Sequence, residues 1–266
     1  MDLGLKDKVV LITGASKGIG KAIAQEFAAE GAKVALSARG ADELERAAAE
    51  IREAGGTALA IAADATNAAD VKRMVDETVA RFSTVHVLVN NAGGIGRFAS
   101  FEELTDEEWL AILDLNIMSA VRATRAVIPQ MKRQHWGRII NISSESGIQP
   151  DPMMPHYNAS KAALNNLTKS LSKAYAKDGI LVNTVSPAFI MTPLVEEMLD
   201  NLAKQKGVSR EQAEREFLAV NRPHIELKRA GRGDEVASAV VYLASEKASY
   251  ITGTNLRVDG GSVASV

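Results

Sequence analysis

Short apolar segments alternate with longer amphipathic segments along most of the chain. The short segments are continuously apolar rather than alternating with polar residues, which is typical of strands buried on both faces of a sheet. We expect seven strands, at residues 8–14, 33–39, 57–64, 85–94, 137–144, 180–187 and 255–261.

The longer segments carry apolar residues at helical spacing. They predict helices at residues 19–32, 41–56, 67–82, about 105–130, about 155–178, 193–221 and 233–245. Thr105 and Glu108 form a capping-box pattern that marks one helix start. Residues 190–230 are charge-rich and contain many Met and Leu residues. We interpret this segment as helical and substrate-covering, with a plain surface helical pair as the alternative.

Repeated alternation of strands and helices predicts parallel strands joined by right-handed crossovers. The fold class is therefore α/β: a single Rossmann-like domain over residues 1–266 with a doubly wound, seven-stranded parallel sheet and helices on both faces. The sequence shows no linker, low-complexity tract or repeat that would divide it.

Composition excludes several classes of protein. The 266 residues carry a net charge of −2 with mixed signs throughout, and they contain neither a basic block nor a run of about 18 apolar residues. We therefore expect neither a nucleic-acid nor a membrane partner. There is no cysteine, and the four histidines are not spaced as a metal pair, so we expect no metal. The N-terminal apolar run is too short for a signal peptide, which favours a cytoplasmic location.

A glycine-rich turn directly follows the first predicted strand. The stretch "TGASKGIG" places Gly14, Gly18 and Gly20 between that strand and the next helix. Glycines there permit a tight turn and let a pyrophosphate approach the unpaired N–H groups of the helix N-terminus. The alternative is a set of glycines that serves turn geometry alone.

The end of the second strand indicates which dinucleotide binds. A fold that prefers NAD usually carries an acidic residue there, which holds the ribose 2′-hydroxyl. This chain reads Ser37-Ala38-Arg39 instead. Arg39, with Lys17 of the glycine turn as a second cation, suits a 2′-phosphate. The pattern favours NADP(H) over NAD(H).

Tyr157 and Lys161 are four residues apart in "YNASK", so a helix would place them on one face. They are either amphipathic residues at a solvent rim or a phenol whose proton is made mobile by an ammonium. An ammonium beside a phenol favours the phenolate and lowers its pKa. A serine near a carbonyl oxygen would stabilise charge that develops there.

Seven motifs together make the chain resemble the short-chain dehydrogenase/reductase (SDR) family. They are "TGASKGIG", "NNAG" (90–93), "LDLNIMSA", "NISS" (141–144), "YNASK", "SPAFIMTP" and "GTNLRVDGG". The resemblance runs from about residue 6 to 262, and 3-oxoacyl-[acyl-carrier-protein] reductases are similar in length and motif. The order of the predicted strands and helices agrees with it independently.

The resemblance implies a role for each matching residue. Tyr157 is implied to be the acid/base, and Lys161 to bind the nicotinamide ribose and lower the tyrosine pKa. Ser144 would hold the substrate oxygen, and Asn116 a water in the proton relay. Cofactor contacts are expected at Gly14, Ser16, Lys17, Gly18, Ile19, Gly20, Arg39, Asp64, Ala65, Asn91, Ala92, Gly93, Tyr157, Lys161, Pro187, Ile190 and Thr192. Ala188 departs from the glycine usual after the proline.

The leading hypothesis is an NADPH-dependent reductase that converts a ketone or 3-oxo group to a secondary alcohol, reversibly. The alternatives are an NAD-dependent dehydrogenase of an alcohol, sugar or steroid, and a cofactor-binding regulator without turnover. Asp178 argues against an acyl-carrier substrate, because a basic residue there would help. The expectation of an apolar substrate rests on Ile148, Met153, Met154, Phe189, Met191, Leu194 and Met198. The family resemblance also implies a homotetramer or homodimer.

Overall fold

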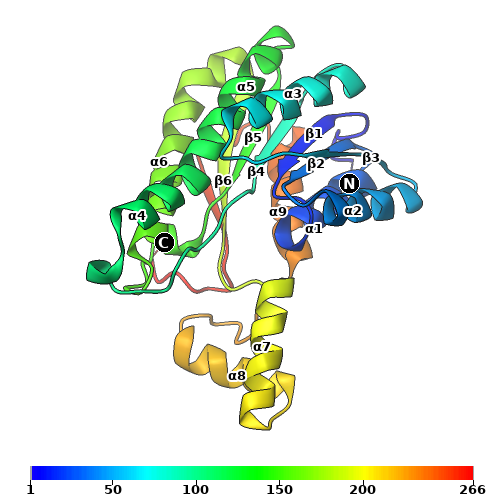
Figure 1. Cartoon of the computed structure of the whole chain (residues 1–266). Helices are drawn as coiled ribbons and strands as arrows, with labels where there is room; N and C mark the ends of the chain where they lie inside the picture. The colour runs from blue at the N-terminus through cyan, green and yellow to red at the C-terminus, as the bar shows by residue number, and fades with distance from the viewer. Residues whose placement is uncertain (1, 266) are drawn as a thin grey trace.

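Seven parallel strands form the centre of the structure, a computed structural model that describes residues 2–265 (Figure 1). They are β1 (Val9–Thr13), β2 (Lys33–Ala38), β3 (Thr57–Ala62), β4 (Val87–Asn90), β5 (Gly137–Ile142), β6 (Ile180–Pro187) and β7 (Asn255–Val258). The spatial order is β3-β2-β1-β4-β5-β6-β7. The order reverses between β1 and β4, which is where ligands bind in open α/β sheets. The predicted fold class and strand number are confirmed.

Helices cover both faces of the sheet, as Figure 1 shows. They are α1 (Gly18–Ala29), α2 (Ala41–Glu53), α3 (Ala68–Phe82), α4 (Asp106–Leu113), α5 (Ser119–Arg133), α6 (Pro155–Tyr175), α7 (Pro193–Lys206), α8 (Arg210–Asn221) and α9 (Gly233–Ala244). Successive strand residues serve opposite faces, since Val10 and Ile12 pack with α1, α2 and α9 while Leu11 packs with α3 and α5. Both faces of the sheet are therefore buried under helices, which explains the continuously apolar strands.

The predicted helix at 105–130 is two α-helices joined by a π turn. Thr105 caps α4, and its capping box with Glu108 is present. Residues Asp114–Met118 then form the π turn that leads into α5. Such a turn is frequent at functional sites, and this one carries Asn116. Among residues 2–265, no helix combines the length and apolar character that a membrane crossing requires.

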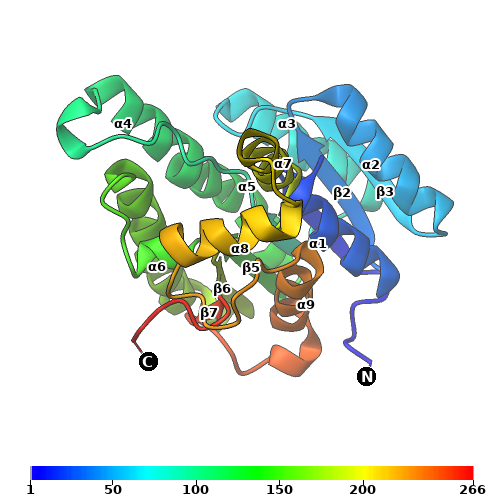
Figure 2. The same ribbon diagram turned by 90° about the horizontal axis from the view of Figure 1, so that it is seen from below.

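The predicted helical segment at 193–221 is also divided in two. Gly207 ends α7 in a left-handed conformation with φ 67°, and the Ser209 side chain caps α8. Figure 2 shows this pair in front of the sheet when the molecule is seen from below, and Figure 1 shows it beyond the carboxyl ends of the strands. Several strands are shorter than predicted because the residues that follow them turn into the loops of the site.

Candidate active site

A cavity of about 500 Å³ lies beside the carboxyl ends of β1, β2, β3 and β4. Most of the predicted cofactor residues line it: Gly14, Ser16, Lys17, Gly18, Ile19, Gly20, Arg39, Asp64, Ala65, Asn91, Ala92, Gly93 and Thr192. Four of the predicted residues do not line it: Tyr157, Lys161, Pro187 and Ile190. Pro187 ends β6 opposite Val258, and Ile190 is buried against Gly231, where it lines a separate cavity.

The glycine turn fits a pyrophosphate. Gly14 has φ +66°, and a Cβ on Gly20 would overlap the carbonyl oxygen of Gly14, so only glycine fits there. The N-cap of α1 is Lys17, whose side chain makes no capping hydrogen bond, and the first turn contains no acidic residue. The N–H groups of this turn therefore meet the cavity without a side-chain acceptor, which is what an anionic group requires.

Asn91 joins β4 to the glycine turn. Its Nδ2 atom donates hydrogen bonds to the carbonyl oxygens of Thr13 and Gly14, each at 2.9 Å. The Thr13 hydroxyl accepts hydrogen bonds from the backbone N–H groups of Asn91 and Ala92, each at 3.0 Å. These hydrogen bonds join the start of the loop after β4 to the glycine turn, and they therefore hold this wall of the cavity in place.

The far end of the cavity carries both signs of charge. The pKa of Asp64 is held below its usual value by hydrogen bonds from the backbone and hydroxyl of Thr66, and the nearby Arg39 charge adds to that effect. Glu43, on the first turn of α2, also lines the cavity. It accepts a hydrogen bond from the Ser16 hydroxyl at 3.0 Å and pairs with Lys17 at 3.8 Å. Glu43 was not predicted, because it lies on the helix that follows β2 and not at the end of the strand, where such an acidic residue is usually found.

Asn116 connects the loop after β4 to helix α6. Its Oδ1 atom accepts a hydrogen bond from the N–H of Gly94, and its Nδ2 atom donates to the Gly94 carbonyl and to the Ser160 hydroxyl, all at 2.9 Å. A Cβ built on Gly93 would lie 3.0 Å from Asn116 Oδ1 and 3.5 Å from Lys161 Nζ. Because Gly93 lines the cavity, Asn116 and Lys161 lie directly behind its wall.

Helix α6 brings Tyr157 and Lys161 to the end of β5. The Lys161 Nζ atom lies 5.6 Å from the centroid of the Tyr157 ring and donates a hydrogen bond to the carbonyl oxygen of Ile142 at 2.9 Å. Ser144 lies two residues after the end of β5, and its hydroxyl accepts a hydrogen bond from the backbone N–H of Ser146 at 3.1 Å. The Ser143 hydroxyl instead donates to the Lys161 carbonyl oxygen at 3.2 Å, which agrees with a structural role.

Burial sets the protonation of both residues. It lowers the pKa of Lys161 to about 8 and raises the pKa of Tyr157 above its ordinary value. A hydrogen bond with Ser144 opposes the shift at Tyr157, while the Glu145 charge reinforces it. Burial is the largest cause of the shift at Tyr157, and the lowering of the tyrosine pKa by Lys161 stays a prediction. Tyr157 holds its proton at neutral pH.

Comparisons with known proteins agree with this geometry. The family model described as short chain dehydrogenase matches residues 8–203. The chain belongs to this family. It is 38% identical to a 3-oxoacyl-[acyl-carrier-protein] reductase of Staphylococcus epidermidis and 36% identical to a D-beta-hydroxybutyrate dehydrogenase of Rhizobium meliloti, in each case over 96% of this chain and 98% of the relative.

A solved structure is similar over the full length of both chains. It is L-sorbose reductase from Gluconobacter frateurii in complex with NADPH and L-sorbose, with a TM-score of 0.95 and 36% identity. This protein is therefore an oxidoreductase that acts on an alcohol or keto group, as its family and its similar relatives indicate.

Proposed function

We propose that the protein is an NADPH-dependent reductase that converts a ketone to a secondary alcohol, with Tyr157 as the proton donor. The observation that carries this proposal is the position of Tyr157 and Lys161 at the end of β5, behind a cavity whose glycine turn suits pyrophosphate and whose far end holds Arg39. NADPH in that cavity would supply the hydride. The similarity to an NADPH-bound reductase supports the choice of cofactor.

The chain's own groups perform the proton chemistry. Negative charge develops on the carbonyl oxygen during reduction, and the Ser144 hydroxyl would donate a hydrogen bond to it. Tyr157 keeps its proton because burial raises its pKa, and this protonated form is the one that a reductase needs for transfer to the developing alkoxide. The Lys161 ammonium, held by Ile142, supplies positive charge beside the phenol.

Glu43 favours a second candidate, an NAD-dependent alcohol dehydrogenase. A carboxylate at this end of the cavity suits the ribose 2′-hydroxyl, and Glu43 already engages Lys17, one of the two cations expected to meet a 2′-phosphate. Arg39 remains for the 2′-phosphate, and for that reason we rank NADPH first.

The test compares the wild-type protein with Tyr157→Phe on a panel of ketones, oxoacyl thioesters and alcohols, with NADPH and NADH in turn. We expect ketone reduction by the wild type and a loss of at least about 10³-fold in kcat for the variant. Cofactor fluorescence titration should show unchanged binding. Full turnover by Tyr157→Phe, or no turnover by the wild type on any substrate class, would overturn the proposal.

Two further expectations join this proposal. We infer that residues 190–230 cover the substrate, since Thr192, Pro193 and Leu194 line the cavity.

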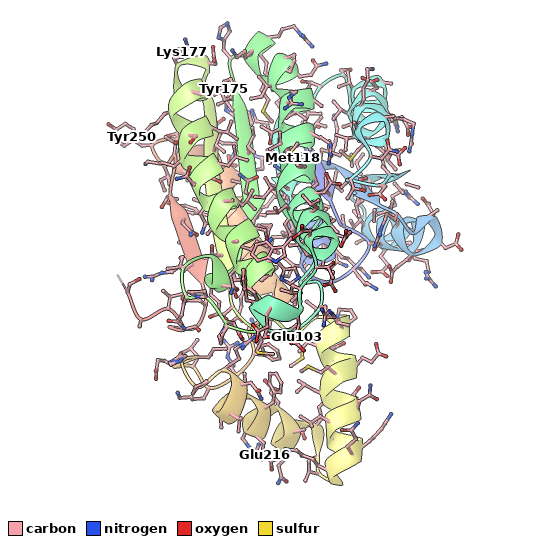
Figure 3. The ribbon with its side chains drawn as sticks, turned by 60° about the vertical axis from the view of Figure 1, so that its left-hand side comes forward. Glu103, Met118, Tyr175, Lys177, Glu216 and Tyr250 are labelled. Atoms are coloured by element: carbon pink, nitrogen blue, oxygen red, sulfur yellow. The ribbon has the colours of Figure 1, made fainter. Side chains whose placement is uncertain are left out.

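We also infer a homotetramer or homodimer that uses α5 and α6. These two helices share an apolar hollow of about 290 Å³, and Ile128, Leu171 and Tyr175 are part of its lining. Figure 3 shows Tyr175 on α6 at the end away from α7 and α8. Light scattering of the purified protein tests the assembly.

A further inference from the structure

Glu145 is a buried carboxyl group directly beside the reaction centre. It follows Ser144 and begins the short 3₁₀ turn Glu145–Gly147 at the carboxyl end of β5. The residue is only 8% exposed, and its Oε2 atom has no hydrogen-bond partner among the described residues. A buried carboxyl oxygen without a partner is costly, so its retention calls for a ligand that pairs with it.

The side chains around Glu145 leave this oxygen unpaired. Burial raises the pKa of Glu145, the Ser262 side chain and the charges of Arg222 and His224 oppose that shift, and the Asp259 charge adds to it.

The two strongest charges in this group already have partners. Arg222 pairs with Asp151 at 3.2 Å. Asp259 accepts hydrogen bonds from the backbone N–H groups of Gly261 and Val263, each at 3.1 Å. Neither of these groups therefore completes the hydrogen bonding of Glu145.

Glu145 also lies within electrostatic reach of the reacting phenol. Its charge is one of the causes that raise the pKa of Tyr157, and the side chain of its neighbour Ser144 acts on the pKa of the same phenol in the opposite direction. The substrate carbonyl must lie against Ser144 and Tyr157 during reduction. The part of the substrate that surrounds this carbonyl is therefore the nearest ligand available to Glu145.

We infer that Glu145 accepts a hydrogen bond from a hydroxyl group of the substrate, so that the enzyme is selective for hydroxylated ketones. This inference rests on the proposed function and departs from the apolar substrate that the sequence suggested. A hydroxyl fits better than the alternatives. An ammonium would bring a second charge into a buried place, and a carboxylate would be repelled by Asp259 and Glu145.

The experiment uses three ketones with one carbon skeleton: erythrulose, 1-hydroxy-2-butanone and 2-butanone. Wild type, Glu145→Leu and Glu145→Gln are compared, with Glu53→Gln at the exposed end of α2 as the matched control. The wild type should prefer the hydroxylated ketones. Glu145→Leu should lose about 10- to 100-fold in kcat/KM on them, mainly through KM, because one hydrogen bond to a charged group is lost.

The loss that Glu145→Leu causes on 2-butanone should be at least about tenfold smaller than its loss on the hydroxylated ketones, because 2-butanone has no hydroxyl for Glu145 to bind. Glu145→Gln keeps an acceptor oxygen and should retain part of the preference, and Glu53→Gln should retain all of it. If fluorescence titration shows that Glu145→Leu does not bind NADPH, the test rests on Glu145→Gln alone. A loss of kcat/KM confined to the hydroxylated ketones would then support the inference.

An equal loss on all three ketones would overturn the inference, because Glu145 would then act through Tyr157 or Ser144. A wild type without preference for the hydroxylated ketones would overturn it as well. In both cases reduction of 2-butanone would leave the proposed function standing. If the wild type reduces none of the three ketones or the wider panel, the proposed function and this inference fail together.

Discussion

The ammonium of Lys161 lies 5.6 Å from the centroid of the Tyr157 ring but donates its hydrogen bond to the carbonyl oxygen of Ile142. The lysine is therefore anchored to β5, and its charge acts on the phenol across space. Both side chains are desolvated, and desolvation favours the neutral form of each. The site keeps a protonated phenol beside an ammonium that is itself held at some cost in stability.

Lys161→Met should make the protein more stable at neutral pH while it abolishes activity. The pKa of Lys161 is about 8 in the folded protein, below its ordinary value of 10.5. Between these values the unfolded chain binds more protons, so this group's contribution to stability rises with pH. At pH 7 burial of the ammonium is fully unfavourable, and its removal should raise the free energy of unfolding by about 1–3 kcal/mol after the lost hydrogen bond is counted.

Urea unfolding at pH 7 and pH 10 measures this effect. The difference between Lys161→Met and wild type should shrink at pH 10, where the lysine of the folded wild type is neutral. Lys72→Met, on the exposed face of α3, is the matched control and should change little. A variant that is less stable than wild type at pH 7 would show that the hydrogen bond to Ile142 outweighs the desolvation.

The reduction rate should fall as pH rises through about 8. Lys161 is charged below its pKa of about 8 and neutral above it, so the positive charge beside the phenol is lost there. We expect kcat/KM for ketone reduction to be flat below this value and to fall up to about tenfold per pH unit above it. Lys161→Arg keeps its charge at every accessible pH, so its residual activity should lack this fall. A break near pH 10 instead would assign the titration to Tyr157.

The apolar pattern of the sequence was sufficient to predict the strands of the sheet, because strands buried on both faces must consist largely of apolar residues. It did not reveal the π turn at Asn116, since i→i+5 hydrogen bonding leaves no trace in apolar spacing. The apolar pattern also did not predict the protonation states of Tyr157 and Lys161. That property depends on how much water the surrounding loops exclude, and those loops come from distant parts of the chain.

At the cofactor end of the site, too, some features follow from the local sequence and others only from the packing of distant segments. The glycine turn and Arg39 follow from local rules about strand ends and helix starts, and both line the cavity. Glu43 belongs to the next helix, and only the packing of α2 against the glycine turn places it beside Ser16 and Lys17. Glu145 was overlooked because a carboxylate beside a serine carries no signal until its burial is known.

Arg39 and Glu43 should have opposite effects on the choice of cofactor. Arg39→Ala removes the cation placed for a 2′-phosphate and should lower kcat/KM with NADPH by about 10- to 100-fold, with little change for NADH. Glu43→Gln removes a negative charge and frees Lys17, so it should raise the NADPH-to-NADH ratio about three- to tenfold. Steady-state kinetics with both cofactors measures these ratios. Arg46→Ala on α2, outside the cavity lining, is the matched control. A ratio unmoved by Arg39→Ala would favour the NAD-dependent candidate.

Asn116→Ala should loosen the loop after β4 as well as reduce activity. The side chain is buried and makes three hydrogen bonds, two with the backbone of Gly94 and one with Ser160. Its removal leaves buried polar groups unpaired, which should cost about 1–3 kcal/mol of stability. Hydrogen exchange at the Gly94 amide should accelerate, and kcat should fall more than NADPH binding. Asn221→Ala removes one exposed hydrogen bond in α8 and is the matched control. Lost activity with unchanged exchange at Gly94 would show that Asn116 acts on the reaction alone and does not hold the loop.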